Sequence, residues 1–279
     1  KTKYVKKMEN TAISPILKNF SFIYNLANNR LMKKVSQQSI SAFFPCFNDE
    51  KTIGKLVEDV NSILKKETKD YEIIVVDDGS QDKSVQILKK LQERHRKLKI
   101  ILHEKNKGYG AALISGFNNC SKDVIFYTDG DGQYSVEEIK VMLPLLTGDI
   151  DFVNGMKISR QDPTYRIFVG NLYSFFARWL FWLPIFDVDC DFRLIRSSLV
   201  KKLKLQSQGG AICIELVKKA QRAGAKFRQV SVHHYRRPHG QSQFFQPKNI
   251  FRTFNELLIL WVKLMIADKF FKKYGNFRI

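Results

Sequence analysis

The run with the clearest chemical meaning is Asp129-Gly130-Asp131, in which one glycine separates two carboxylates. It follows the apolar stretch 124–128, so both side chains are expected at the end of a buried element. Carboxylate oxygens are ligands that suit Mg²⁺ or Mn²⁺. A cation held by the pair would bridge to a diphosphate and neutralise charge on a departing group. The alternative is an ordinary turn, because Asp-Gly pairs form turns readily.

Two other acidic groups are candidates for binding. Asp77 and Asp78 follow the apolar stretch 72–76 and could accept hydrogen bonds from a nucleobase or ribose. The alternative there is a turn followed by a helix N-cap. The segment DVDCD at 187–191 alternates acids with other residues. Its acids would share one strand face near an acceptor, or stand at the edge of a loop.

Two segments suggest phosphate binding. Residues 233–243 read HHYRRPHGQSQ, with two Arg and three His within seven residues, which suits an anion clamp. The alternative is a solvated basic loop. Gly108-Tyr109-Gly110 opens a predicted helix, but it is a weak dinucleotide-binding signal because it follows the third strand and Leu113 replaces the last glycine.

Alternating apolar and amphipathic stretches would position these residues. Strands that alternate with helices of about 10 to 15 residues predict right-handed crossovers and a mostly parallel sheet. Ligands of such sheets bind beyond the carboxyl ends of the strands. Because three predicted strands end in acidic or other polar residues, we expect one shared polar site. The predicted strands are 40–44, 72–76, 99–102 and 124–128, and the predicted helices are 50–66, 83–95, 110–120 and 135–146.

The charge of the chain is concentrated in its flanks. The 279 residues include 47 Lys and Arg and 27 Asp and Glu, a formal net charge of +20. Residues 1–40 hold eight basic residues and one acid, and residues 228–279 hold ten and two. Apolar and aromatic residues accompany these charges, which favours an anionic membrane surface over nucleic acid. The four cysteines form no CxxC pair, so we expect reduced thiols in the cytosol.

Three regions follow from this distribution. They are a basic amphipathic segment over 1–38 with a helix near 15–34, a central α/β domain over 39–246, and a basic amphipathic helix over 247–279. No run of 18 apolar residues predicts a spanning helix. The stretches 172–186 and 257–267 are the most apolar, and each predicts a core helix or one lying in the bilayer interface. Basic residues around the second stretch favour the interface.

Six motifs in this order resemble the family-2 glycosyltransferases. Within that family they are most similar to the branch that transfers hexoses to dolichol or polyprenyl phosphate, typified by dolichyl-phosphate mannose synthase. The resemblance covers about residues 39–246, and the ordered set is specific although each motif alone is loose. The motifs are PCFNDE at 45–50, VDDGS at 76–80, GYGAAL at 108–113, DGDGQ at 129–133, DCDFRL at 189–194, and the loop with Arg237, Gly240 and Ser242.

The resemblance implies a GT-A (Rossmann-like) fold and an enzyme that inverts the anomeric centre in a single displacement. It implies a nucleotide-sugar donor of the GDP-mannose or UDP-glucose type, Mg²⁺ or Mn²⁺, and a polyprenyl or dolichyl phosphate acceptor. The enzyme would be cytoplasmic and peripheral on the cytoplasmic face of a membrane. A phosphate acceptor is already anionic and needs no base, whereas a hydroxyl acceptor would use Asp191 or Asp189 as its base.

The resemblance also assigns individual residues. Asp131, Asp191 and Arg237 are expected to be catalytic, and Glu215 matches a recurring acid of the family. The metal is expected to be held by Asp129, Asp131 and Gln133. The donor is expected to contact Pro45, Phe47, Glu50, Asp77, Asp78, Gly108, Asp129, Gln133, Arg160, Arg193 and Ser242.

Other functions fit parts of the sequence. An enzyme of the same fold could act on a soluble sugar or a protein hydroxyl, with the basic flanks serving only to dock a partner. A nucleic-acid-binding module would explain the net charge, but acidic strand ends repel phosphates unless a metal intervenes. The misplaced glycines disfavour a Rossmann dehydrogenase.

Overall fold

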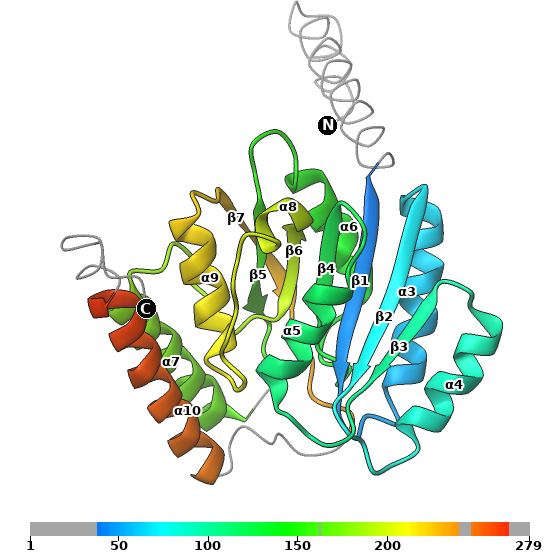
Figure 1. Cartoon of the computed structure of the whole chain (residues 1–279), viewed down its shortest axis with the longest axis horizontal. Helices are drawn as coiled ribbons and strands as arrows, with labels where there is room; N and C mark the ends of the chain where they lie inside the picture. Colours follow the sequence, from blue (N-terminus) through cyan, green and yellow to red (C-terminus); the bar gives the residue numbers. More distant parts are fainter. Residues whose placement is uncertain (1–37, 162, 240–246, 268–279) are drawn as a thin grey trace, which may run out of the picture.

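A computed structural model describes residues 38–161, 163–239 and 247–267. Within them, seven strands form one sheet in the order β3-β2-β1-β4-β6-β5-β7, with helices on both faces (Figure 1). The predicted mostly parallel α/β sheet is confirmed, and each of the four predicted strands lies within an observed one. The strands are β1 Ser39–Cys46, β2 Asp70–Asp77, β3 Leu98–Leu102, β4 Val124–Thr128, β5 Phe152–Ile158, β6 Phe192–Arg196 and β7 Phe227–His233.

The sheet changes direction at one strand. β1 pairs in parallel with β2 and β4, and β2 pairs in parallel with β3. β6 runs antiparallel to both β4 and β5, and β7 is parallel to β5. The carboxyl end of β4 therefore lies beside the amino end of β6. Residues that follow β4 and residues that precede β6 meet at the same edge of the sheet.

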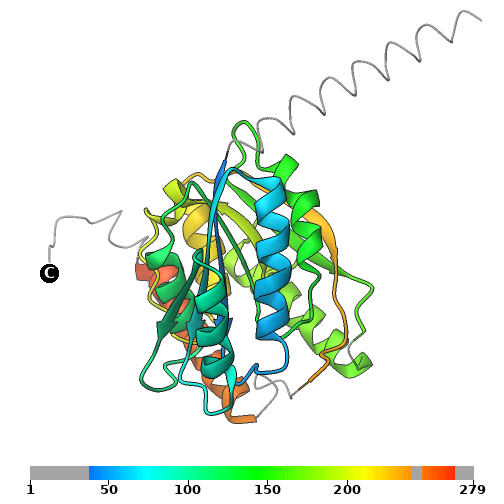
Figure 2. The ribbon, with the colours of Figure 1, turned by 90° about the vertical axis from the view of Figure 1, so that its right-hand side faces the viewer.

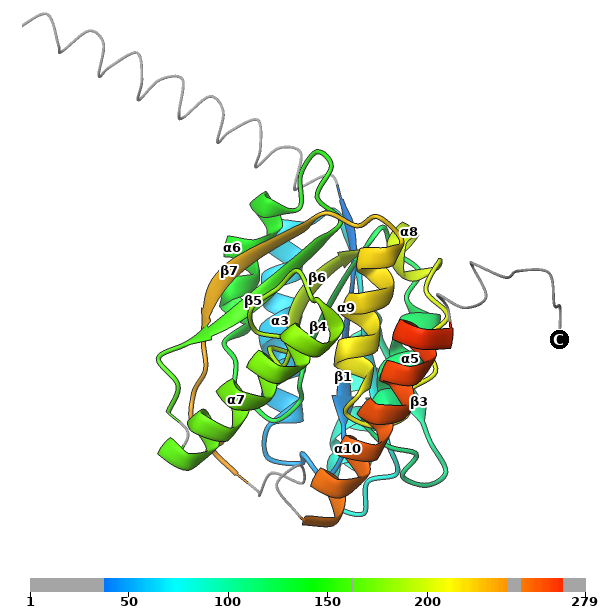
Figure 3. The same ribbon diagram turned by 90° about the vertical axis from the view of Figure 1, so that its left-hand side faces the viewer.

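Two apolar layers cover the faces of the sheet. Phe44 packs with buried residues of α3 and α4, on the side seen in Figure 2, whereas its neighbour Phe43 packs with those of α5 and α9. Figure 3 shows α7, α9 and α10 grouped on the opposite side. This alternation is what a strand buried on both faces requires. The α-helices are α3 Ile53–Glu67, α4 Ser84–Arg94, α5 Tyr109–Asn119, α6 Ile139–Met142, α7 Thr164–Phe181, α8 Ser197–Val200, α9 Ile212–Arg222 and α10 Pro247–Trp261.

The predicted helix over 135–146 is wrong in detail. The segment is a 3₁₀ turn at Val136–Glu138, the short helix α6, and a second 3₁₀ turn at Leu143–Leu145. Elsewhere, the π-helical turn Val262–Ala267 extends α10. Pro144 has no backbone N–H to continue an α-helix, which explains the interruption. The predicted helix over 15–34 lies outside the described residues.

The helices α7 and α10 expose much of their apolar surface. In α7 only Ala177 and Phe181 are buried, so a core-helix interpretation of 172–186 does not hold for most of the stretch. In α10 and the turn after it, one side packs on the core through the buried Leu260 and Leu264, whereas Leu258, Ile259 and Val262 are exposed. Trp261 Nε1 donates to the Leu180 carbonyl at 3.2 Å and ties the two helices together. Across the described ranges, no helix is both long enough and apolar enough to span a bilayer.

Candidate active site

Three carboxylates meet where β4 ends and β6 begins. Thr128 pairs with Phe192, so Asp129 and Asp191 are the next residues across the same edge. Burial, followed by the charges of Asp191 and Asp131, raises the pKa of Asp129 well above its usual range. The acids that follow β4 therefore lie with the acid that precedes β6, and a site shared with the ends of the first two predicted strands stays a prediction. Such mutual repulsion favours a cation between the carboxylates.

Asp129 accepts a hydrogen bond from a tyrosine at the start of α5. The Tyr109 hydroxyl donates to Asp129 Oδ1 at 2.8 Å. Tyr109 is the first residue of α5, and among 108–110 the sequence pattern predicted a role only for the glycines. Its partner lies 20 residues away along the chain, so no local pattern signals the contact.

Asp131 is paired with the predicted anion clamp. Arg237 Nη2 lies 2.5 Å from Asp131 Oδ2, and the Gln133 backbone N–H donates to Asp131 Oδ1 at 3.0 Å. Gln133 also binds the arginine loop, since its Nε2 donates to the Tyr235 carbonyl at 3.1 Å. The DGDGQ turn and the loop after β7 thus form one unit. Ser242, the other predicted residue of that loop, lies outside the described residues.

Asp191 rests on a buried polar floor. The Tyr127 hydroxyl donates to Asp191 Oδ1 at 3.3 Å, and Cys213 Sγ lies 3.3 Å from the same oxygen. Arg193 is fully buried and donates to the Tyr127 hydroxyl at 2.6 Å and to Asn154 Oδ1 at 2.9 Å. Its guanidinium is thus occupied by protein groups, and its Nη2 also lies 3.5 Å from Asp191 Oδ1.

Asp189 belongs to the acidic segment 187–191, for which the sequence allowed either a strand face or the edge of a loop. It lies in the loop that precedes β6. Ser174 Oγ on α7 donates to its Oδ2 at 3.2 Å, and Lys157 Nζ donates to its carbonyl at 2.7 Å. Burial raises the pKa of Asp189 to about 7, against the lowering effect of Lys157. A carboxyl group with such a pKa is suited to accept a proton near neutral pH.

Of the two adjacent acids in the first motif, Asp49 is the one directed at the site. A Cβ on Gly130 would lie 3.3 Å from Asp49 Oδ2, and Asp131 and Arg237 both influence its charge. Burial raises the pKa of Asp49 to about 6. Glu50 Oε2 instead accepts from the Lys83 backbone N–H at 2.9 Å. The sequence singled out Glu50 and missed Asp49.

The other residues predicted from that motif lie around the same turn. A Cβ on Gly130 would lie 2.8 Å from the Pro45 carbonyl, so this backbone borders the acidic pair. The Phe47 backbone N–H donates to Asp49 Oδ2 at 3.1 Å. Contact of Pro45 and Phe47 with a nucleotide-sugar donor stays a prediction.

The acids after β2 hold their own loops. Asp77 Oδ1 accepts the Gly79 and Ser80 backbone N–H groups, and the buried Oδ2 has no hydrogen-bond partner among the residues that the structure describes. Asp78 accepts from His103 Nδ1 at 2.6 Å and from the backbone N–H of Gly108 at 2.9 Å. The structure therefore shows a loop-fixing role for both residues, and their contact with a nucleobase or ribose remains a prediction.

Gly108 and Arg160 complete the predicted set. Gly108 has φ of +99°, and a Cβ there would meet the Gln208 carbonyl at 2.6 Å. The glycine thus allows two backbones to approach closely. Arg160 Nη1 lies 3.4 Å from Asn171 Oδ1 and so reaches α7.

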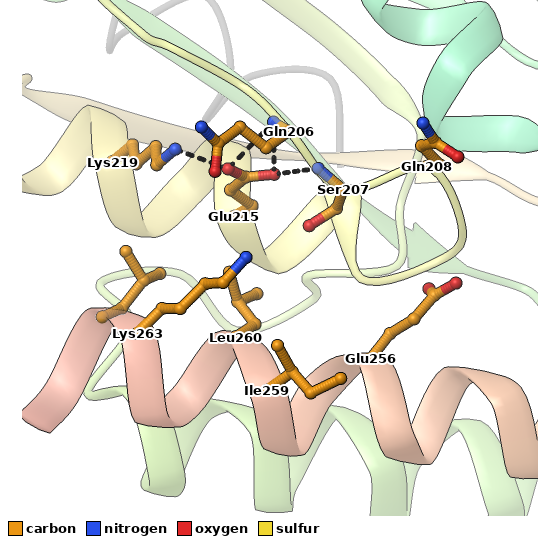
Figure 4. A pocket seen from close by; sticks show the side chains of 10 residues that line it. Gln206, Ser207, Gln208, Glu215, Lys219, Glu256, Ile259, Leu260 and Lys263 are labelled. Carbon is orange, nitrogen blue, oxygen red and sulfur yellow. Dashed lines mark hydrogen bonds and ion pairs between the residues drawn. The ribbon is translucent and has the colours of Figure 1, made fainter. Parts of the chain in front are cut away.

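Glu215 fixes a loop beside a second hollow. Its carboxylate accepts the Gln206 and Ser207 backbone N–H groups, the latter at 2.7 Å, and pairs with Lys219 (Figure 4). Burial is the largest single effect on Glu215 and raises its pKa. The hydrogen bonds from Lys219, Ser207 and Gln206 together outweigh burial, so the pKa of Glu215 is lowered. A cavity of about 450 Å³ separates this loop and α9 from α10. The recurring acid of the family is thus a loop anchor here.

The residues present fit a divalent cation that shares its ligands with a diphosphate. Among the residues that the structure describes, no three His, Cys, Asp or Glu side chains are arranged to hold a metal alone. Mg²⁺ is commonly held by one or two carboxylates together with substrate phosphates. The Arg237 guanidinium on Asp131 Oδ2 is a stand-in positive charge at the same carboxylate.

Comparison with known proteins identifies relatives over most of the chain. The model of glycosyl transferase family 2 matches residues 41–204. The undecaprenyl-phosphate 4-deoxy-4-formamido-L-arabinose transferase of Pseudomonas fluorescens (strain SBW25) is 27% identical over 214 residues, which are 76% of this chain and 62% of that protein. The protein of the same name from Edwardsiella ictaluri (strain 93-146) is 27% identical over 208 residues, 74% of this chain and 63% of that one. The chain thus spans less than two thirds of the length of these curated relatives.

A solved structure shares the fold. It is glucosyl-3-phosphoglycerate synthase from Mycobacterium tuberculosis in complex with Mn²⁺, uridine diphosphate and phosphoglyceric acid. The TM-score is 0.63 at 18% identity, with 84% of this chain and 82% of that chain covered. The same enzyme in complex with Mg²⁺ and uridine diphosphate has a TM-score of 0.62 at 16% identity, with 82% of each chain covered. These likenesses confirm the GT-A fold.

Proposed function

The chain belongs to glycosyl transferase family 2, and from this premise we propose that it transfers a sugar from a nucleoside diphosphate sugar to a polyprenyl or dolichyl phosphate. The observation that carries the proposal is the meeting of Asp129, Asp131 and Asp191 at the edge shared by β4 and β6, with Arg237 on Asp131. The names of the curated relatives, which are undecaprenyl-phosphate sugar transferases, support the acceptor class.

The donor side of the reaction needs positive charge where the diphosphate leaves. Asp129 and Asp131, with Gln133 beside them, would hold Mg²⁺ or Mn²⁺, which neutralises the leaving diphosphate when bound. Arg237 supplies further positive charge from a loop that Gln133 ties to the acidic turn. The bound Mn²⁺ or Mg²⁺ in the solved structures of the same fold supports a divalent ion.

The acceptor side differs between the two candidate acceptors. A lipid phosphate arrives as an anion and attacks the anomeric carbon without a base. A soluble hydroxyl needs a base, and a specific observation favours this second candidate, because the pKa of Asp189 is raised to about 7 by burial. Asp189 and Asp191 lie on the loop that precedes β6, and the charge of Asp191 acts on Asp129.

The exposed faces of α7 and α10 support docking on the cytoplasmic face of a membrane. Trp179 and Trp182 are 70% and 74% exposed, and Phe254 on α10 is 64% exposed. Aromatic side chains lie favourably at the level of lipid headgroups, and basic segments are attracted to anionic leaflets. The basic residues of 228–279 flank this surface in the sequence. Peripheral attachment would bring a lipid-linked phosphate within reach of the site.

A thermal-shift screen of GDP- and UDP-sugars, with and without Mn²⁺, tests the donor. A true donor at a hundredfold excess over its Kd should stabilise the fold by about 2.7 kcal/mol. The Asp131→Ala variant should lose the part of the shift that depends on Mn²⁺. Equal shifts in the variant and the wild type would remove the metal site from the proposal.

Transfer of a radiolabelled sugar from the donor found in this way tests the acceptor. Label entering polyprenyl phosphate, but not soluble sugars or a protein hydroxyl, supports the proposed function. Label entering only a soluble hydroxyl, with loss of transfer in Asp189→Asn, would support the second candidate instead.

A further inference from the structure

Tyr109, at the start of α5, donates a hydrogen bond to one member of the acidic pair Asp129 and Asp131. Its hydroxyl lies 2.8 Å from Asp129 Oδ1, the distance of a well-formed hydrogen bond between a hydroxyl and a carboxylate. The phenol O–H is the donor and the carboxylate oxygen is the acceptor. The bond therefore fixes one oxygen of Asp129 and the plane of its carboxylate.

The backbone on both sides of Tyr109 is held against a second loop. A Cβ on Gly108 would lie 2.6 Å from the Gln208 carbonyl, and one on Gly110 would lie 2.2 Å from the Ser207 carbonyl. The Gly110 backbone N–H donates to the Gln208 carbonyl at 2.8 Å. Only glycine permits this approach, so the two glycines and the loop fix where the tyrosine begins.

The loop that clamps the glycines is itself anchored. The buried Glu215 carboxylate accepts the Ser207 backbone N–H at 2.7 Å and the Gln206 backbone N–H at 3.1 Å. Tyr109 therefore extends from a backbone that hydrogen bonds secure on α9, and not from a free loop. A ring placed on such a support can set the direction of Asp129 with little freedom of its own.

From this arrangement we propose that Tyr109 is a positioning residue for metal binding, which orients Asp129 so that its second oxygen faces the ion. The inference rests on the proposed function, because it requires that Asp129 and Asp131 bind Mg²⁺ or Mn²⁺. It adds a residue that neither the motif nor the family resemblance assigned. Partners that orient a metal-binding side chain typically change metal affinity about 10- to 100-fold when removed.

Mn²⁺ binding to the full chain, followed by electron paramagnetic resonance with GDP or UDP present, tests this role. Tyr109→Phe keeps the ring and removes only the donor, so we expect Mn²⁺ to bind about 10- to 100-fold more weakly and the signal of bound Mn²⁺ to change. The matched control is Tyr71→Phe, which removes a hydroxyl that donates to Asn61 Oδ1 at 2.8 Å on another part of the fold. The control should bind Mn²⁺ as the wild type does.

Three outcomes separate this inference from the proposed function. Weaker binding in Tyr109→Phe with an unchanged thermal unfolding midpoint supports it. Wild-type affinity in Tyr109→Phe, while Asp129→Asn loses binding, overturns the positioning role and leaves the metal site intact. Absence of Mn²⁺ binding by the wild-type chain overturns the metal site of the proposed function, and the positioning role with it.

Discussion

At the scale of single residues, the site is a set of acids whose charges the fold keeps close together. Asp189 shows the cost of this arrangement, because burial and the charges of Asp187 and Asp191 outweigh the help that Lys157 and Ser174 give to ionisation. Burial raises its pKa to about 7. The folded chain therefore binds a proton there that the unfolded chain releases at lower pH.

This raised pKa predicts how stability depends on pH. A group whose pKa is higher in the folded state stabilises it fully below the unfolded pKa, about 3.9 for Asp, and that contribution falls as the pH rises towards 7. Asp189→Asn removes the effect, so the variant should be more stable than the wild type at pH 7.5 by on the order of 2 to 4 kcal/mol. The difference should shrink towards pH 4.

Urea unfolding of both proteins across this pH range measures the difference. Asp59→Asn is the control for loss of one negative charge, since Asp59 is an exposed residue paired with Lys55 on α3. The control should show no comparable dependence on pH. A gap between Asp189→Asn and the wild type that stays constant from pH 4 to pH 7.5 would contradict the assignment.

The sequence predicts the acidic pair but not every residue around it. Asp129 and Asp131 are evident because their spacing and their place after a strand are local properties. The choice between Asp49 and Glu50 is not local, because Ser84 Oγ accepts the Asp49 backbone N–H at 3.0 Å and Lys83 holds Glu50. Both partners come from the following βα unit, more than 30 residues along the chain.

At the scale of elements, the sequence predicts the strands β1 to β4 but not the strands β5 to β7. The strands β1 to β4 are apolar runs, so periodicity predicts them. In contrast, β6 reads FRLIR and contains the fully buried Arg193. Two of its partners, Tyr127 and Asn154, lie 66 and 39 residues away. Asp191, Cys190 and Val188 contact Arg193 from nearby in the sequence, but the two distant partners cannot be read from the local pattern.

The contact between the start of α5 and the loop 206–209 predicts the effect of a single methyl group. In Gly110→Ala the new Cβ would lie 2.2 Å from the Ser207 carbonyl, and the obstacle is backbone that cannot rotate away. We expect a loss of about 1 to 3 kcal/mol in the free energy of unfolding. Urea denaturation followed by circular dichroism measures it.

Gly54→Ala is a matched control for that substitution, because Gly54 also lies in the first turn of a helix. A Cβ there would lie 3.2 Å from Ile87 Cγ2, a side-chain atom that needs to shift by only a few tenths of an ångström. Alanine is the better helix former, so the control should be neutral or stabilising by up to about 1 kcal/mol. Equal losses in both variants would show that the loop contact is not what requires glycine at Gly110.

At the scale of the whole molecule, net charge and apolar surface act on different terms of membrane binding. The formal net charge is +20 and is concentrated in the flanks of the sequence. The exposed aromatic side chains of Phe175, Trp179 and Phe254 belong to α7 and α10, which lie on one side of the sheet (Figure 3). Electrostatic attraction weakens as salt is added, whereas burial of apolar surface does not. The two contributions can therefore be separated by experiment.

Sedimentation of the full chain with vesicles of phosphatidylglycerol and phosphatidylcholine makes this separation. We expect the double variant Phe175→Ser and Trp179→Ser to bind about 100-fold more weakly or worse at every salt concentration, because each side chain loses about 1.5 kcal/mol or more of apolar burial. Added salt should weaken the wild type and the variant by the same factor. Val141→Ser, an exposed apolar residue on α6 that is 53% exposed, serves as the control and should bind normally. Unchanged binding by the double variant would show that α7 does not face the bilayer, and the acceptor would then have to be sought in solution.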